Sequence, residues 1–154
     1  LNKKPYLIPR DGKKLDTSSY VSLEDVLLNL SKLSVLENIN SITIFLDVKY
    51  INFQESIENY KYPELSKKLC LLASSSSKET SIEIDDMKHS IFSYFLMKGL
   101  KGDAYGDDKI LEIGELAEYL YRKIPDYTKN LENGLLQNPE FIGSDLKRVL
   151  IDLR

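Results

Sequence analysis

The chain has 154 residues, of which 42% are hydrophobic and 29% charged, and its formal net charge is −3. These values are typical of one globular domain with a core of its own, and without a basic surplus they give no support for binding nucleic acid. No apolar run approaches the roughly 18 residues that cross a membrane, and no secretory signal is visible, so we expect a cytoplasmic protein. The single cysteine, Cys70, excludes an internal disulfide and any cysteine-rich zinc site.

The first half of the chain predicts strand, helix and strand in turn. Residues 5–9 form a short apolar strand pattern, and Ser22 followed by two acids is typical of a helix start. The apolar side chains that follow share one face of that helix, which should end before residue 38: Leu23, Val26, Leu27, Leu30 and Leu33. The apolar run 42–48 indicates a strand covered on both faces, and residues 49–66 are predicted as a long loop with room for one helical turn.

The second half continues the alternation. Residues 68–73 predict a second buried strand, which ends in a run of serines, and residues 78–88 are acidic and irregular. A helix over 89–101 should stop at Gly102, and an amphipathic helix over 113–124 should be halted by Pro125. The pattern at 149–151 is typical of a last strand. Strands that alternate with helices predict a single α/β domain over residues 1–154, with a mostly parallel sheet and helices on both faces.

Several stretches together resemble the caspase and metacaspase family of cysteine peptidases. The most specific combination is KGLKGDA (98–104), GELAEYL (114–120) and IPDY (124–127). The other matching stretches follow the order that the family uses: PYLIPRDG (5–12), SLEDVLLNL (22–30), ITIFLDV (42–48), LLASSSSKETSIE (71–83) and LLQNP (135–139). The resemblance covers nearly the whole chain and implies the caspase-like three-layer sandwich.

The resemblance also implies a catalytic dyad of His and Cys, which this sequence does not match. In the family the histidine precedes the strand equivalent to residues 5–9, so we expect the chain to lack the first strands and the histidine segment, and to be part of a larger protein. The nucleophile belongs to an Asp-x-Cys-x-Ser-Gly motif after the strand equivalent to 42–46. Asp47 matches its first position, but Lys49 stands at the cysteine position, and Ile51 and Asn52 replace Ser-Gly. A protonated amine cannot replace a thiolate, so the sequence predicts an inactive relative.

Three side chains could replace the missing groups, and the sequence favours a simpler role for each. Cys70 lies in the middle of a predicted strand, where a cysteine behaves as a small hydrophobic residue. His89 opens a predicted helix and suits a capping or surface role. Lys49 could act as a base or as a Schiff-base amine only if it were desolvated, and nothing near it in the sequence would do so.

The resemblance places Asp47 in a pocket for an Arg or Lys side chain of the substrate. Other sides of this pocket are implied for Ser75, Glu79, Ser81 and Glu83. Lys78 beside Glu79 argues against a pocket for basic residues. The alternative is that Asp47 caps a loop or pairs with Lys49.

The sequence predicts neither a cofactor nor a metal. The acids of residues 103–108 resemble a calcium-binding loop, but Asp108 stands where such a loop needs Gly and Gly114 where it needs Glu. These residues are therefore interpreted as a helix-capping loop. Some metacaspases need calcium, which leaves this ion open for the chain, but the sequence offers no cluster of ligands.

Three functions fit these observations. The first is a pseudopeptidase that binds a protein or peptide, or regulates an active relative, and that could dimerise through an edge strand at residues 149–153. The second is a fragment of an active cysteine endopeptidase, whose Cys and His come from segments outside this chain. The third is a structural α/β domain of a larger receptor or effector.

Overall fold

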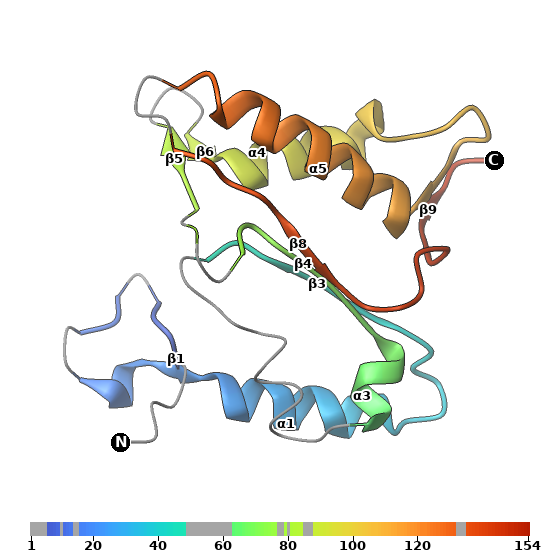
Figure 1. Cartoon of the computed structure of the whole chain (residues 1–154). Helices are drawn as coiled ribbons and strands as arrows, with labels where there is room; N and C mark the ends of the chain where they lie inside the picture. Colours follow the sequence, from blue (N-terminus) through green and yellow to red (C-terminus); the bar gives the residue numbers. More distant parts are fainter. Residues whose placement is uncertain are drawn as a thin grey trace. The chain divides into compact units, whose positions relative to one another are not determined.

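A computed structural model describes residues 6–9, 11–13, 16–48, 63–76, 79, 81–84, 88–131 and 135–154. The chain divides into two compact units, the first formed by residues 1–42 and 51–69 and the second by residues 43–50 and 70–154. Figure 1 shows the helices and strands of both units. Among the described residues, no helix has the length and apolar character needed to cross a membrane.

The first unit is built on helix α1 (Leu23–Ser34), which packs against the short helix α3 (Pro63–Lys68). Strand β1 (Tyr6–Leu7) pairs antiparallel with β2 (Val21–Ser22), directly before α1. The helix begins as predicted, because the Ser22 hydroxyl accepts the N–H of Asp25 at 3.4 Å. The predicted apolar face is correct for Leu23 and Leu27, which are buried, but wrong for Leu33, which is 46% exposed. Ser34 takes that place on the buried face, because one further residue turns the helix by about 100°.

The second unit contains a three-stranded sheet in the order β3 (Ile42–Leu46), β4 (Leu69–Ala73) and β8 (Glu140–Ile142). The N–H of Ser74 donates to the carbonyl of Leu46 at 2.8 Å, which joins the ends of β3 and β4 and shows that they run in the same direction. Strand β8 runs antiparallel to β4, with Phe141 opposite Leu72.

Strand β4 is buried at every residue, as the sequence predicts. The prediction that the strand over 42–48 is covered on both faces is wrong, because Phe45 is 37% exposed. Strand β3 has a single neighbour in the described sheet, so it lies at an edge there.

Two long helices cover one face of β4 (Figure 1). Helix α4 (Ile91–Lys98) continues into a π-helical turn (Gly99–Asp103) and packs against α5 (Ile113–Thr128). Their apolar side chains form one core with two residues of β4 and with neighbouring segments: Cys70, Leu72, Ile82, Ile91, Phe92, Phe95, Leu111, Ile113, Leu116, Ala117, Tyr119, Leu120 and Ile124.

Two small antiparallel sheets flank these helices. Strand β5 (Glu83–Ile84) pairs with β6 (His89–Ser90), and β7 (Ile110–Glu112) pairs with β9 (Val149–Asp152). The predicted last strand therefore exists, but it pairs with β7 in a separate sheet. The α/β class is confirmed for the described residues, whereas the mostly parallel sheet is not. A connection as short as that between β5 and β6 permits only antiparallel pairing.

Several predicted boundaries are wrong. The second apolar helix begins at Ile91 rather than at His89, because the hydroxyl of Ser90 accepts the N–H of Ser93 at 3.0 Å and caps it. Gly102 ends this helix as predicted, with φ at 137°. The last helix passes through Pro125 to Thr128, since a proline in the final turn removes only one helical hydrogen bond. Residues 49–62 lie outside the described part, and α3 occupies the end of the predicted loop.

Candidate binding site

Three serine hydroxyls surround the carboxylate of Asp47, the residue that follows β3. Ser81 donates to Oδ1 at 2.8 Å, Ser93 donates to Oδ2 at 2.6 Å, and Ser90 donates to Oδ2 as well. We refer to Asp47 with these three serines as the hydroxyl cradle. Asp47 itself is exposed, so the cradle opens to solvent with a net negative charge.

The first turn of α4 places two of the three hydroxyls. Ser90 is the N-cap of α4 and Ser93 lies in its first turn, so both face the positive end of the helix dipole. The carboxylate of Asp47 therefore sits where a negative charge is stabilised. The third hydroxyl, that of Ser81, comes from a buried residue two positions before β5.

The backbone beside Asp47 is held by Ser74, the residue that follows β4. The hydroxyl of Ser74 accepts the N–H of Val48 at 3.2 Å and donates to the carbonyl of Val48 at 3.0 Å. These two contacts fix the direction in which the chain leaves β3. Lys49, which the resemblance places at the nucleophile position, lies outside the described residues.

Among the described residues, the cradle leaves one lone-pair position of Asp47 without a donor. A carboxylate offers about four lone-pair positions, two on each oxygen. Both positions on Oδ2 and one on Oδ1 are taken by the serines. An incoming cation could therefore make one direct hydrogen bond to Oδ1 and further bonds to the hydroxyl oxygens of Ser90 and Ser93, which can accept as well as donate.

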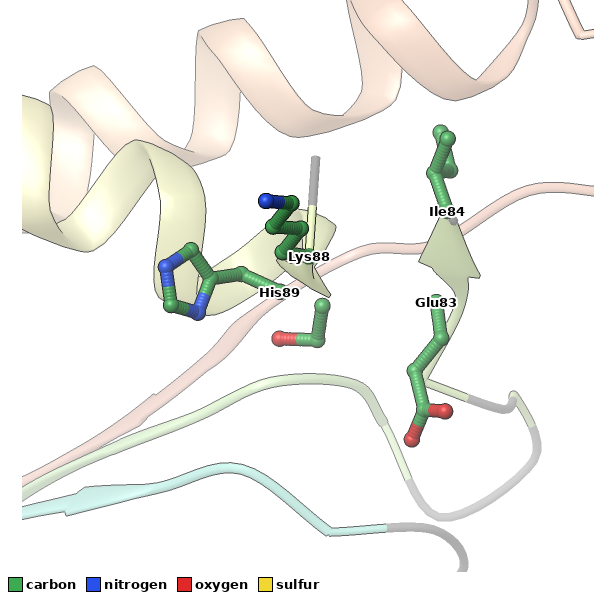
Figure 2. A pocket seen from close by; sticks show the side chains of 5 residues that line it. Glu83, Ile84, Lys88 and His89 are labelled. Carbon is green, nitrogen blue, oxygen red and sulfur yellow. The ribbon is translucent and has the colours of Figure 1, made fainter. Parts of the chain in front are cut away.

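An open hollow of about 390 Å³ adjoins the cradle and shares Ser90 with it. The other described residues that line it are Glu83 and Ile84 from β5, and Lys88 and His89 from the side of β6 (Figure 2). Figure 2 shows Glu83 and His89 on opposite sides of this hollow. His89 is exposed, which confirms the surface role, whereas its predicted role as a helix cap belongs to Ser90.

The structure separates the other residues implied for the pocket. Glu83 lines the hollow next to the cradle, and Ser81 belongs to the cradle itself. The carboxylate of Glu79 instead accepts two hydrogen bonds from Asn138, and the hydroxyl of the buried Ser75 donates to the carbonyl of Glu79 at 3.5 Å. These two residues brace the loop after β4.

Two members of the cradle, Ser90 and Ser93, were missed by sequence reasoning. A serine directly before an apolar run is a helix-capping signal, as at Ser22, although the two acids that follow Ser22 have no counterpart after Ser90. That signal would have identified Ser90 as a cap. The partner of both hydroxyls is Asp47, more than 40 residues earlier, and no local pattern indicates it.

Cys70, the single cysteine of the sequence, does not form a nucleophilic site. Cys70 is 0% exposed, and its Sγ donates toward the carbonyl of Asp145 at 3.7 Å. Burial raises the pKa of the Cys70 thiol, with the nearby Arg148 acting in the opposite direction. A buried, neutral thiol is a poor nucleophile, so the prediction of a core role for Cys70 is confirmed.

The acidic loop over residues 103–108 has local partners. Asp108 accepts the N–H of Ile110 at 3.1 Å, and Asp103 accepts the hydroxyl of Tyr119 at 3.3 Å. Within the described residues, no group of three or more His, Cys, Asp and Glu side chains is arranged to hold a metal ion.

Comparisons of this chain with models of protein families, with curated proteins and with solved structures found no match. The likeness to the caspases therefore depends on the short stretches of sequence quoted above.

Proposed function

We propose that this chain is a catalytically inactive, caspase-like domain that binds a basic segment of a protein or peptide at Asp47. The observation that carries the proposal is the exposed carboxylate of Asp47, held by three hydroxyls at the end of β3. The resemblance adds an independent reason, because it implies for this residue a role in binding substrate Arg or Lys. The proposal includes the caspase-like three-layer sandwich and the cytoplasmic location expected from the sequence.

Two observations support binding without hydrolysis. Lys49 occupies the position of the nucleophile in the sequence, and the thiol of Cys70 is buried in the core. An acyl-transfer reaction by a cysteine peptidase needs an accessible thiolate beside a base. In the described part of the chain, the hydroxyls of Ser81, Ser90 and Ser93 donate to a carboxylate, which is an acceptor for them and not the imidazole of a hydrolytic triad.

The geometry favours lysine over arginine as the bound side chain. An arginine guanidinium binds a carboxylate best with two parallel bonds, one to each oxygen, but Oδ2 of Asp47 already accepts two hydroxyls. A lysine ammonium is a compact charge with three donors. It can bond Oδ1 directly and use its other donors on the hydroxyl oxygens of Ser90 and Ser93.

Peptide binding tests this proposal directly. Fluorescence polarisation with short labelled peptides that end in Lys, Arg or the neutral isostere norleucine gives three affinities for the chain. We expect the Lys peptide to bind most tightly and the norleucine peptide at least about ten times more weakly, which corresponds to about 1.4 kcal/mol. Asp47→Asn should remove this preference, since it keeps the shape of the side chain and removes its charge.

The matched control is Asp107→Asn, which removes the same charge from another exposed position of the same unit. Equal affinities for the unchanged chain and Asp47→Asn would rule out this site.

Hydrolysis distinguishes the proposal from the active-fragment alternative. Fluorogenic peptides ending in Arg, Lys or Asp should stay intact with the unchanged chain. The Lys49→Cys variant tests whether restoring the thiol is sufficient for cleavage. Turnover by a longer protein that contains this chain, with Lys49 unchanged, would show instead that a Cys and a His from segments outside the chain complete an active peptidase.

A dimer through the C-terminal strand also belongs to this proposal. Strand β9 pairs with β7, and Val149 at its start is 52% exposed. Sedimentation velocity over a wide range of concentrations should show a dimer, and a monomer throughout would remove this part of the proposal without affecting the peptide site.

A further inference from the structure

The side chain of Gln137 lies fully buried beside the segments that form the hydroxyl cradle. Its Nε2 donates to the carbonyl of Ser74 at 2.7 Å, and its Oε1 accepts the N–H of Ile82 at 2.9 Å. Its backbone N–H donates to the hydroxyl of Thr128 at 3.3 Å, at the end of α5. One buried amide thus joins the end of β4 to the segment before β5.

The two partners of the Gln137 side chain, Ser74 and Ile82, both adjoin the hydroxyl cradle. The hydroxyl of Ser74 holds both backbone groups of Val48, the residue after Asp47. Ile82 follows Ser81 in the chain, so its N–H belongs to the peptide bond between these two residues.

A further connection runs from Gln137 through the backbone carbonyl of Ile82 to α4. This carbonyl accepts the N–H of Ile91 at 2.9 Å. Ile91 follows Ser90, and α4 carries Ser93 one turn further on. Gln137 is therefore connected, through one or two hydrogen bonds and short stretches of backbone, to the segments that carry Asp47 and the three hydroxyls.

The chemistry of this position fits an amide of this length and few other side chains. One end must donate to a carbonyl and the other must accept from an N–H, which a primary amide does with its two termini. In a buried place, the loss of either partner leaves a polar backbone group without a hydrogen bond.

We infer that Gln137 is a positioning residue of the Asp47 site. Its amide sets the spacing between the end of β4 and the segment 81–84, which is joined to the start of α4 through the Ile82–Ile91 hydrogen bond, and so it orders the three hydroxyls around Asp47 before any ligand arrives. What the ordered cradle binds rests on the proposed function, whereas the positioning itself does not.

Amide hydrogen exchange of the whole chain tests the positioning without a ligand. In Gln137→Met, which keeps the length of the side chain but neither hydrogen bond, we expect the N–H groups of Ile82 and Val48 to exchange at least ten times faster than in the unchanged chain. The N–H groups of Leu120 and Leu116, in the middle of α5, serve as the internal reference and should keep their rates. Ile124→Val removes one methylene from the same core and should leave Ile82 and Val48 unaffected.

A conservative variant supplies a rescue that depends on pH. Gln137→Glu places a carboxyl group in a buried site, where the neutral form is favoured. The neutral acid can donate to the carbonyl of Ser74 and accept from Ile82, whereas the ionised form can only accept. Protection of the Ile82 and Val48 N–H groups should therefore return as the pH falls, and Gln137→Met should show no such return.

Unchanged exchange at Ile82 and Val48 in Gln137→Met would overturn the inference, and so would equal acceleration across α5. The Lys-peptide affinity is measured on the same variants, and we expect it to fall about tenfold in Gln137→Met. If the unchanged chain binds no peptide, the proposed function fails while the exchange rates still decide the role of Gln137.

Discussion

Glu79 holds Asn138 at two points. Its Oε2 accepts the backbone N–H of Asn138 at 2.7 Å, and its Oε1 accepts the side-chain Nδ2 at 2.6 Å. The N–H of Ser76 also donates to the carbonyl of Asn138 at 3.0 Å. The loop after β4 is therefore fastened to the segment before β8, and the charge of Glu79 is directed toward that segment.

We predict that Glu79→Ala destabilises the chain by about 1–2 kcal/mol, because two hydrogen bonds to a charged group are lost at a partly exposed site. Glu79→Gln should lose less, since its carbonyl oxygen still accepts the N–H of Asn138. Urea unfolding followed by circular dichroism measures both variants. No loss of stability in Glu79→Ala would show that this contact contributes little.

We predict that Cys70 reacts slowly with thiol reagents in the folded chain. The thiol is fully buried, and its raised pKa keeps it neutral near pH 8. Modification by a chromogenic disulfide should be at least about ten times slower than in urea, because the reagent has to wait for the core to open. Cys70→Ala provides the blank. Rapid labelling of the folded chain would place this thiol at the surface and weaken the case for an inactive domain.

We predict that the chain loses stability at alkaline pH through Tyr119. Burial, and then the charge of Asp103 that its hydroxyl faces, raise the pKa of Tyr119 from 10 to about 12. A raised pKa in the folded state means that its contribution is complete below pH 10 and is lost as the pH rises toward 12. The absorbance of phenolate, taken as the difference between the unchanged chain and Tyr119→Phe, isolates this group among the ten tyrosines.

The variant Asp103→Asn should lower the pKa of Tyr119, but not to its ordinary value, because burial is the larger cause of the shift. The control for this titration is Asp107→Asn, an exposed acid of the same loop. An unchanged midpoint in Asp103→Asn would show that burial alone shifts this hydroxyl.

We predict that Pro125→Ala stabilises the chain by about 1–2 kcal/mol. Alanine supplies the N–H that proline lacks toward the carbonyl of Tyr121, and part of the roughly 3 kcal/mol penalty of an interior proline is offset by the stiffer unfolded chain. Thermal unfolding compares it with Lys123→Ala, an exposed change in the same helix. A loss of stability would mean instead that the proline directs Tyr127 against Phe95, whose ring centroid lies 5.7 Å away.

Elements with strong local signals were predicted well. Ser22 begins α1, the apolar run at 69–73 is the buried strand β4, and Gly102 ends the α4 segment. The two-residue strands β5 and β6 were not predicted, because such short strands have no periodicity and form only where the surrounding fold pairs them. The expectation that Pro125 halts the last helix failed, because Ile124 before it and Thr128 after it are both buried and hold the helical turn in place.

The candidate site was predicted in part. Asp47 was singled out from its place after an apolar strand, and Ser81 and Glu83 from the resemblance. Gln137 appeared in the sequence only as part of the matching stretch LLQNP (135–139), and its two side-chain partners lie 63 and 55 residues away. A role that depends on such distant partners cannot be read from a local pattern.

Separation along the chain also governs when the hydroxyl cradle can assemble during folding. Asp47 is separated from Ser81, Ser90 and Ser93 by 34, 43 and 46 residues, so three chain loops have to close before its carboxylate is surrounded. Loop closure of this kind belongs to the slow, late part of folding. A ligand that binds only the completed cradle would by mass action favour the folded chain.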